Sequence, residues 1–149
     1  RLFYNDLKMN SPSYIINISS LGAYQPMPFK AVYAATKTFI YFFSRAITNE
    51  LKKENIHVAV VSPGPVLTNV NVKNRIGQLG WFIKKSVLTP NQVAVSTIDK
   101  ILKGKHVIIP GCVNKLLYGF GLIVPIRLKN FFLKQNIPQF RLHSLELHL

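Results

Sequence analysis

Hydrophobic residues follow two different patterns along the chain, short continuous runs and longer periodic segments, and the difference predicts where strands and helices lie. Short, nearly continuous apolar runs at 14–18, 56–61 and 106–109 are bounded by turn residues, which is typical of buried parallel strands. Between them, apolar residues recur at steps of three and four over 30–53 and over 90–103, which predicts two helices. The alternation of strands and helices indicates an α/β fold with a parallel sheet.

Local signals refine the ends of these elements. Residues 1–9 read as the last turns of a helix that closes at Asn10-Ser-Pro12. Thr89 followed by Pro90 is an N-cap with proline at the first helical position. The 30–53 segment is apolar and aromatic on nearly all sides, which predicts burial on more than one side and contact with a second copy of the chain, a homo-oligomer.

Three polar residues suggest chemistry at the end of the first strand. Ser20 lies thirteen residues before Tyr33, and Tyr33 lies four residues before Lys37, so the last two share one face of the predicted helix. An ammonium beside a phenol favours the phenolate and lowers the pKa of the tyrosine toward the range of a proton-transfer catalyst. Ser20 can hydrogen-bond the oxygen on which charge develops. Its neighbour Ser19 is the better candidate for capping the turn.

These residues resemble a known family when they are taken in order along the chain. The segments are Tyr14-Ile-Ile-Asn-Ile-Ser-Ser20, Tyr33-Ala-Ala-Thr-Lys37 and Ser62-Pro-Gly-Pro-Val-Leu-Thr68, and together they resemble the short-chain dehydrogenase/reductases. The resemblance covers roughly residues 1–111. It implies the C-terminal half of a Rossmann-like, doubly wound domain with three α/β/α layers, and it leaves 112–149 as a basic, apolar extension.

The resemblance also implies an activity, the transfer of a hydride between NADP or NAD and a carbonyl or alcohol substrate. In that reading Tyr33 is the proton donor, Ser20 holds the substrate oxygen, and Lys37 binds the ribose next to the nicotinamide. Tyr33 and Lys37 therefore also count as cofactor-binding residues. Four residues after the second strand would meet the nicotinamide end of the cofactor: Pro63, Gly64, Val66 and Thr68.

One element of the family pattern does not occur in these 149 residues. The sequence contains no GxxxGxG or GxGxxG turn, which holds the pyrophosphate in dinucleotide-binding domains. We therefore expect the sequence to be the later part of a larger protein. The rival hypothesis is a truncated, non-catalytic chain whose apolar helices serve interaction or oligomer assembly.

The composition of the chain limits its expected binding partners and its expected cellular compartment. The chain has 149 residues, 48% of them hydrophobic and 16% charged, which is typical of a folded domain. Its net charge of +14 favours anionic partners such as phosphorylated cofactors or acidic lipid surfaces, and no recognised nucleic-acid motif accompanies the basic residues. The single cysteine, Cys112, favours a reducing, cytoplasmic setting, and we expect it to be a small buried residue. The four histidines lack metal-ligand spacing, so no metal site is predicted.

The segment Leu116–Ile126 stands out as eleven uncharged residues with Lys115 before it and Arg127 and Lys129 after it. At about 1.5 Å per residue it is too short to cross a hydrocarbon layer of ~30 Å. Two alternatives stay open, a helix lying on an anionic membrane surface and a helix packed on the domain. The apolar character also suggests a lipophilic substrate, such as a fatty acyl, steroid or retinoid compound.

Overall fold

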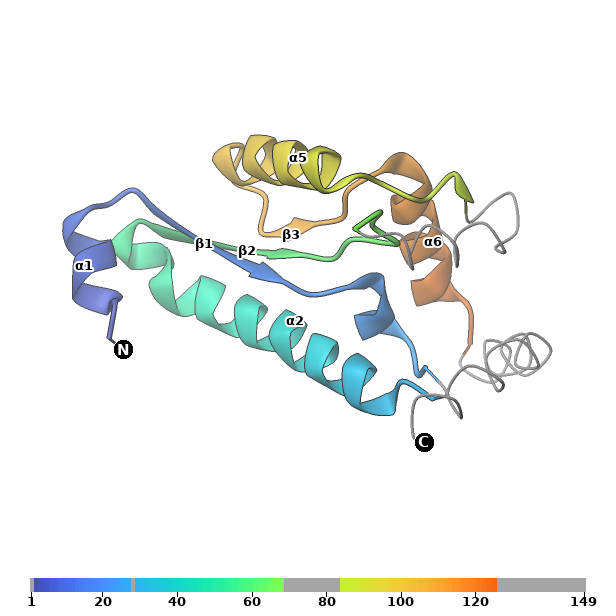
Figure 1. Cartoon of the computed structure of the whole chain (residues 1–149). Helices are drawn as coiled ribbons and strands as arrows, with labels where there is room; N and C mark the ends of the chain where they lie inside the picture. Colours follow the sequence, from blue (N-terminus) through green and yellow to red (C-terminus); the bar gives the residue numbers. More distant parts are fainter. Residues whose placement is uncertain (1, 28, 69–83, 126–149) are drawn as a thin grey trace, which may run out of the picture.

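A parallel three-stranded sheet lies between two layers of helices. The computed structural model describes residues 2–27, 29–68 and 84–125. Strands β1 (Ser13–Ile18), β2 (Ile56–Val61) and β3 (Val107–Ile108) pair in the order β1-β2-β3, all parallel. Helix α2 (Ala31–Leu51) runs along one face of the sheet and α5 (Pro90–Leu102) along the other (Figure 1). The predicted α/β fold, Rossmann-like with three layers, is confirmed.

Shorter elements connect these layers. Helix α1 (Tyr4–Met9) precedes β1, and a 3-10 turn, η1 (Leu21–Tyr24), follows it. A second 3-10 turn, η2 (Lys52–Glu54), extends α2, and α6 (Cys112–Ile123) follows β3. The elements lie close to their predicted bounds, except that α6 begins four residues before the uncharged run at Leu116.

The core is built around β2, which is buried on both faces. Ala59 and Val61 pack on the same side as Ile101 of α5, whereas Val60 packs with Tyr41 of α2 on the other. Side chains of β2 alternate between the two helical layers because successive residues of a strand point to opposite faces. Each buried aliphatic side chain stabilises the fold by roughly 1.5–3 kcal/mol. The continuous apolar run of β2 is thus explained by its position as the central parallel strand, which is covered by helices on both faces.

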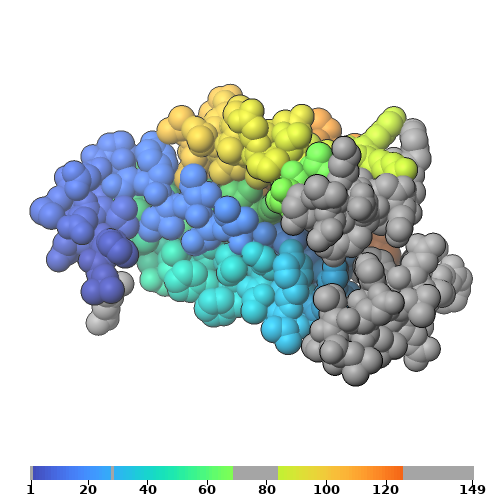
Figure 2. Space-filling model, viewed as in Figure 1, coloured from blue at the N-terminus to red at the C-terminus, as the bar shows by residue number. Residues whose placement is uncertain are grey.

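Strand β1 departs from the prediction of a strand buried on both faces. Asn17 faces α2, where its amide donates to Ser44 Oγ at 2.9 Å. The opposite face carries Tyr14, Ile16 and Ile18, whose side chains are 40%, 40% and 61% exposed. Helix α5 lies over β2 and β3, and the blue region that contains β1 reaches the surface between α5 and α2 (Figure 2). The predicted burial is therefore wrong for this face.

Helix α2 is buried along one stripe. Ala34, Tyr41 and Ser44 point into the domain. Phe39 and Phe43, with ring centroids 5.7 Å apart, are 67% and 48% exposed. No described element lies over this aromatic outer face, so within one chain α2 is covered on one side only, and the expected contact with a second copy stays a prediction.

Helix α5 begins with the predicted N-cap. The Thr89 hydroxyl accepts a hydrogen bond from Gln92 N at 3.3 Å, and the Gln92 side chain accepts one from Thr89 N at 2.9 Å. This reciprocal pair is a capping box, and Pro90 occupies the first turn where no N–H is needed.

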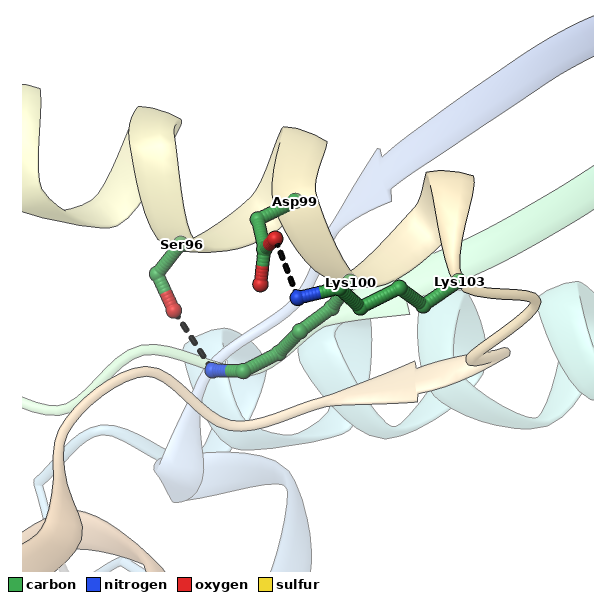
Figure 3. Close-up of polar contacts among 4 residues, drawn as sticks. All are labelled: Ser96, Asp99, Lys100 and Lys103. Carbon is green, nitrogen blue, oxygen red and sulfur yellow. Dashed lines mark hydrogen bonds and ion pairs between the residues drawn. The ribbon is translucent and has the colours of Figure 1, made fainter.

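Polar contacts on α5 lie on the surface and near α6. Lys103 pairs with Asp99 at 2.6 Å, and Lys100 Nζ donates to Ser96 Oγ at 2.5 Å (Figure 3). Burial, followed by repulsion from Lys115 of α6, lowers the pKa of Lys100. The Lys100 ammonium is therefore held against its own helix by the Ser96 hydroxyl.

The C-terminal part of the described chain ends shortly after α6. Cys112 is exposed, so its predicted burial is wrong; two residues along a helix rotate by about 200°, which places it opposite the buried Asn114. Among the described residues, no helix combines the length and apolar character needed to cross a membrane. Ile126, Arg127 and Lys129, which belong to the predicted surface helix and its flank, lie outside the described residues.

The capping box predicts a measurable effect on stability. Thr89→Ala removes the acceptor for Gln92 N and is expected to lower the free energy of unfolding by about 1 kcal/mol. Urea denaturation followed by circular dichroism measures the change. Thr89→Ser retains the hydroxyl and serves as the matched control; equal losses in both variants would contradict the capping role.

Candidate active site

The candidate site lies where β1 and β2 end, and backbone contacts hold these ends together. Ser19 N donates to Val61 O at 2.7 Å, which continues the β1–β2 pairing by one residue. The Ser19 hydroxyl donates to Lys37 O at 2.7 Å and so ties the same point to α2. Open parallel sheets bind ligands at this carboxyl edge.

Ser20 begins the loop that follows β1. Its hydroxyl oxygen accepts a hydrogen bond from Gly22 N at 3.1 Å, so Ser20 caps η1. The assignment of the capping task to Ser19 is therefore wrong, because the Ser19 hydroxyl is committed to Lys37 O. A hydroxyl that accepts one bond still has its own proton to donate. Ser20 can thus hold η1 in place and donate to a ligand oxygen at the same time.

Tyr33 and Lys37 lie in the first turns of α2 and share one face, as their spacing predicts. Lys37 Nζ is 5.9 Å from the centroid of the Tyr33 ring and donates to Ile18 O at 3.1 Å. The Tyr33 side chain is 44% exposed, and no described residue hydrogen-bonds its hydroxyl. The ammonium is therefore anchored at the end of β1, beside an accessible phenol.

Gly22 shows that Ser20 and Tyr33 border the same space. A Cβ built on Gly22 would lie 3.3 Å from Tyr33 Cε1 and 3.5 Å from Ser20 Oγ. The same Cβ would be 2.8 Å from Met27 Sδ, so a side chain at this position would displace its surroundings. The structure thus brings Ser20, Tyr33 and Lys37 to one edge of the sheet, and the missing side chain of Gly22 lets Ser20 and Tyr33 lie close to its backbone.

The turn after β2, residues 63–68, lies beside η1. Pro63 O accepts a hydrogen bond from Leu21 N at 3.0 Å. Val66 forms an isolated parallel bridge with Leu88, through bonds of 2.8 Å from Leu67 N to Leu88 O and 3.0 Å from Leu88 N to Pro65 O. Thr68 is exposed at the end of its described segment. The turn is therefore fastened to η1 on one side and to residue 88 on the other.

Gly64 faces the side chain of Asn114, a residue that no sequence pattern singled out. A Cβ built on Gly64 would lie 2.2 Å from Asn114 Oδ1, and Asn114 is completely buried. In the structure the amide of Asn114 requires glycine at this position. No sequence motif marks Asn114; its burial is visible only in the folded chain.

Three tyrosines join η1, α2 and α6 next to the turn. Tyr24 makes edge contacts with Tyr41 and Tyr118, with ring centroids 4.9 and 4.6 Å apart, and its hydroxyl lies 2.9 Å from Ser62 Oγ. Burial raises the pKa of Tyr24 strongly, although the hydrogen bond with Ser62 opposes part of the shift. Burial, followed by interaction with Tyr41, also raises the pKa of Tyr118. Burial therefore favours the neutral phenols of Tyr24 and Tyr118.

Other parts of the described surface add little chemistry. A cleft of about 590 Å³ between α2 and the loop at 23–27 is lined by small and apolar side chains, and Ser20, Tyr33 and Lys37 do not line it. The described residues contain no group of three or more His, Cys, Asp or Glu side chains arranged to hold a metal ion. His143 and His148 lie outside the described residues.

The fold and the site define a class of protein. A parallel sheet covered on both faces, with Ser20, Tyr33 and Lys37 at its carboxyl edge, is the arrangement of a Rossmann-like α/β domain, a fold that places its ligands at that edge. The family model described as short chain dehydrogenase matches residues 1–78, which is more than half of the chain. The chain belongs to this family.

Individual relatives agree with this assignment. The 7beta-hydroxysteroid dehydrogenase of Mediterraneibacter gnavus is 30% identical over 112 residues, which cover 72% of this chain and 43% of the relative. A solved structure of a 7beta-hydroxysteroid dehydrogenase superposes with a TM-score of 0.72 at 22% identity, over 89% of this chain and 52% of that one. A short chain dehydrogenase from Burkholderia cenocepacia, solved with NADP, gives 0.68 at 21% identity, over 88% and 51%. The chain thus spans about half the length of these relatives.

The buried phenol of Tyr24 predicts a dependence of stability on high pH. Because its pKa is raised in the folded state, the folded protein keeps a proton that the unfolded chain loses above its ordinary pKa of 10.0. The contribution to stability is complete below that pH and is lost as the pH rises further. We expect the free energy of unfolding to fall less steeply above pH 10 in Tyr24→Phe than in the parent, as measured by urea denaturation. Parallel curves would contradict the prediction.

Proposed function

We propose that the protein to which these residues belong transfers a hydride between NAD(P)(H) and a carbonyl or alcohol. The observation that carries the proposal is the convergence of Ser20, Tyr33 and Lys37 on one edge of the sheet. Membership of the short chain dehydrogenase family supports a dehydrogenase or reductase role.

The hydroxyls of Ser20 and Tyr33 have different roles at the substrate oxygen. In the direction of reduction, the carbonyl carbon receives the hydride and the carbonyl oxygen receives the proton of the Tyr33 hydroxyl, which yields an alcohol. Ser20 donates its proton in a hydrogen bond to the same oxygen, because its own oxygen already accepts from Gly22 N. The 44% exposure of Tyr33 supports access of a substrate to its hydroxyl.

Lys37 and the 63–68 turn fit the nicotinamide end of the cofactor, which supplies the hydride when bound. The ammonium group has three N–H donors and uses one on Ile18 O, so two are available for ribose hydroxyls. The same ammonium lies 5.9 Å from the centroid of the Tyr33 ring, so one residue can contact the ribose beside the proposed proton donor. In the turn, Pro63, Gly64, Val66 and Thr68 are proposed to contact the nicotinamide. The solved relative with NADP supports a cofactor of this kind.

The substrate is proposed to be lipophilic. Two observations support this: the relative from Mediterraneibacter gnavus is a hydroxysteroid dehydrogenase, and α6 carries exposed apolar side chains. These are Leu116, Phe120, Leu122 and Ile123. The same side chains, with Lys115 on the same helix, support peripheral contact of α6 with an anionic membrane surface. Steroid and fatty acyl ketones are therefore the first compounds to assay.

The catalytic assignment predicts the effect of one hydroxyl. Since these 149 residues contain no Gly-rich turn, the assay uses the chain placed behind a Gly-rich half from the same family. Tyr33→Phe is expected to lower kcat for carbonyl reduction by about 10²–10⁴-fold while cofactor affinity changes little, because only the transferred proton is removed. Lys37→Met is expected to weaken cofactor binding as well.

A matched control is available on β1. Tyr14 is similarly exposed, at 40%, and stacks on His57 away from the site, so Tyr14→Phe removes a comparable hydroxyl without touching the proposed chemistry. Steady-state kinetics and cofactor titration distinguish the variants. A kcat for Tyr33→Phe within a few-fold of that of Tyr14→Phe would refute the assignment.

The exposed aromatic side chains of α2 favour a second role, assembly into a homo-oligomer. Phe39, Phe42 and Phe43 are 67%, 62% and 48% exposed on one helix, and apolar surface of this kind is typical of subunit contacts. We expect Phe39→Glu combined with Phe43→Glu to lower the mass measured by light scattering after gel filtration. Ile98→Glu, an exposed apolar position on α5, is the control. An unchanged mass in the α2 variant would contradict assembly through this face.

A further inference from the structure

Asn114 is a buried amide in the first turn of α6, and its position is unusual for a residue so close to a helix start. The side chain is 0% exposed. Its Nδ2 donates to Ser86 O at 2.9 Å and to Pro110 O at 3.0 Å. One carboxamide thus joins three parts of the chain: α6, the end of β3, and the segment that carries Ser86.

The carbonyl oxygen of the Asn114 amide points at Gly64 in the 63–68 turn. A Cβ on Gly64 would lie 2.2 Å from Asn114 Oδ1 and 2.7 Å from its Cγ, so the oxygen occupies the space a side chain would need. No described residue donates a hydrogen bond to this buried oxygen. On the Nδ2 side, a Cβ on Gly111 would be 3.1 Å away, and Gly111 has φ +84. Two glycines therefore enclose the amide.

The segment held by Asn114 is the one that fastens the turn. Two residues after Ser86, Leu88 exchanges hydrogen bonds with residues on both sides of Val66: Leu88 N donates to Pro65 O, and Leu67 N donates to Leu88 O. A displacement of the Asn114 amide would release Ser86 O, and with it the strand-like pairing that positions 65–67. The contact of Oδ1 with Gly64 acts on the same turn directly.

We propose that Asn114 is the positioning residue of the 63–68 turn, which it sets at a defined distance from Ser20, Tyr33 and Lys37. An apolar side chain would fill the space without leaving a buried carbonyl oxygen, so the amide is favoured for its two directed N–H bonds rather than its volume. The effect on catalysis rests on the proposed function above, whereas the effect on the turn does not. Helix α6 thereby becomes a structural part of the candidate active site.

The first experiment tests the contact by a double-mutant cycle on the chain of residues 1–149. Gly64→Ala is expected to lower the melting temperature in the parent, because its new methyl group meets the Asn114 amide. In an Asn114→Ala background the obstacle is gone, and the same substitution is expected to have a clearly smaller effect. Additive effects of the two substitutions would overturn the contact.

The second experiment measures the turn itself. Amide hydrogen exchange of Leu67 and Leu88, whose N–H groups make the pairing, is compared with that of Val60 in β2 as an internal reference. Asn114→Leu keeps the volume and removes the donors, and it is expected to speed exchange at Leu67 and Leu88 at least tenfold more than at Val60. If exchange accelerated equally at all three amides, Asn114 would contribute only to overall packing, and the proposal would be overturned.

A control amide and a kinetic measurement complete the test. Asn17→Ala removes another partly buried amide, the one bonded to Ser44, and is expected to leave the exchange at Leu67 and Leu88 unchanged relative to Val60. In the active chimera, Asn114→Leu is expected to raise KM for the cofactor about tenfold with a smaller change in kcat. If the parent shows no reductase activity, the proposed function fails, and hydrogen exchange alone decides the role of Asn114.

Discussion

The parallel pairing of β2 with its two neighbours is the constraint on which the rest of the structure depends. Strand β2 is hydrogen-bonded on both edges and buried on both faces. The strand register therefore determines where each of its residues lies along the sheet and which face its side chain points to. The register that pairs Ile18 with Val61 brings the ends of β1 and β2 to one level. The serine loop and the 63–68 turn start from these two ends, so their proximity follows directly from the strand register.

Local chemistry made much of this fold predictable from the sequence. Strand β2 was recognisable as an apolar run between turn residues, and its predicted bounds agree with the structure. Helix α5 was recognisable by Thr89 and Pro90, and the four-residue step from Tyr33 to Lys37 correctly placed them on one face. In each of these cases the sequence pattern lies within a few neighbouring residues, and the local structure that it predicts is retained in the folded chain.

The features that were missed depend on neighbours distant in sequence. Whether the outer face of β1 is covered depends on what packs there, and local periodicity carries no such information. Ser19 and Ser20 are equally plausible caps in the sequence; only the position of Lys37 O decides between them. Asn114 resembles an ordinary polar residue at a helix start until β3 and residue 86 surround it. The catalytic roles of Ser20, Tyr33 and Lys37 stay predictions.

The close approach of Asn114 to Gly64 also has an evolutionary consequence. Fifty positions separate the two residues, yet a methyl group on one would overlap the oxygen of the other. Position 64 therefore cannot enlarge alone: a larger residue there becomes acceptable only after the amide at 114 has been replaced by something smaller. Among descendants of a common ancestor, the two sites should change together, and the order of the two substitutions should be constrained.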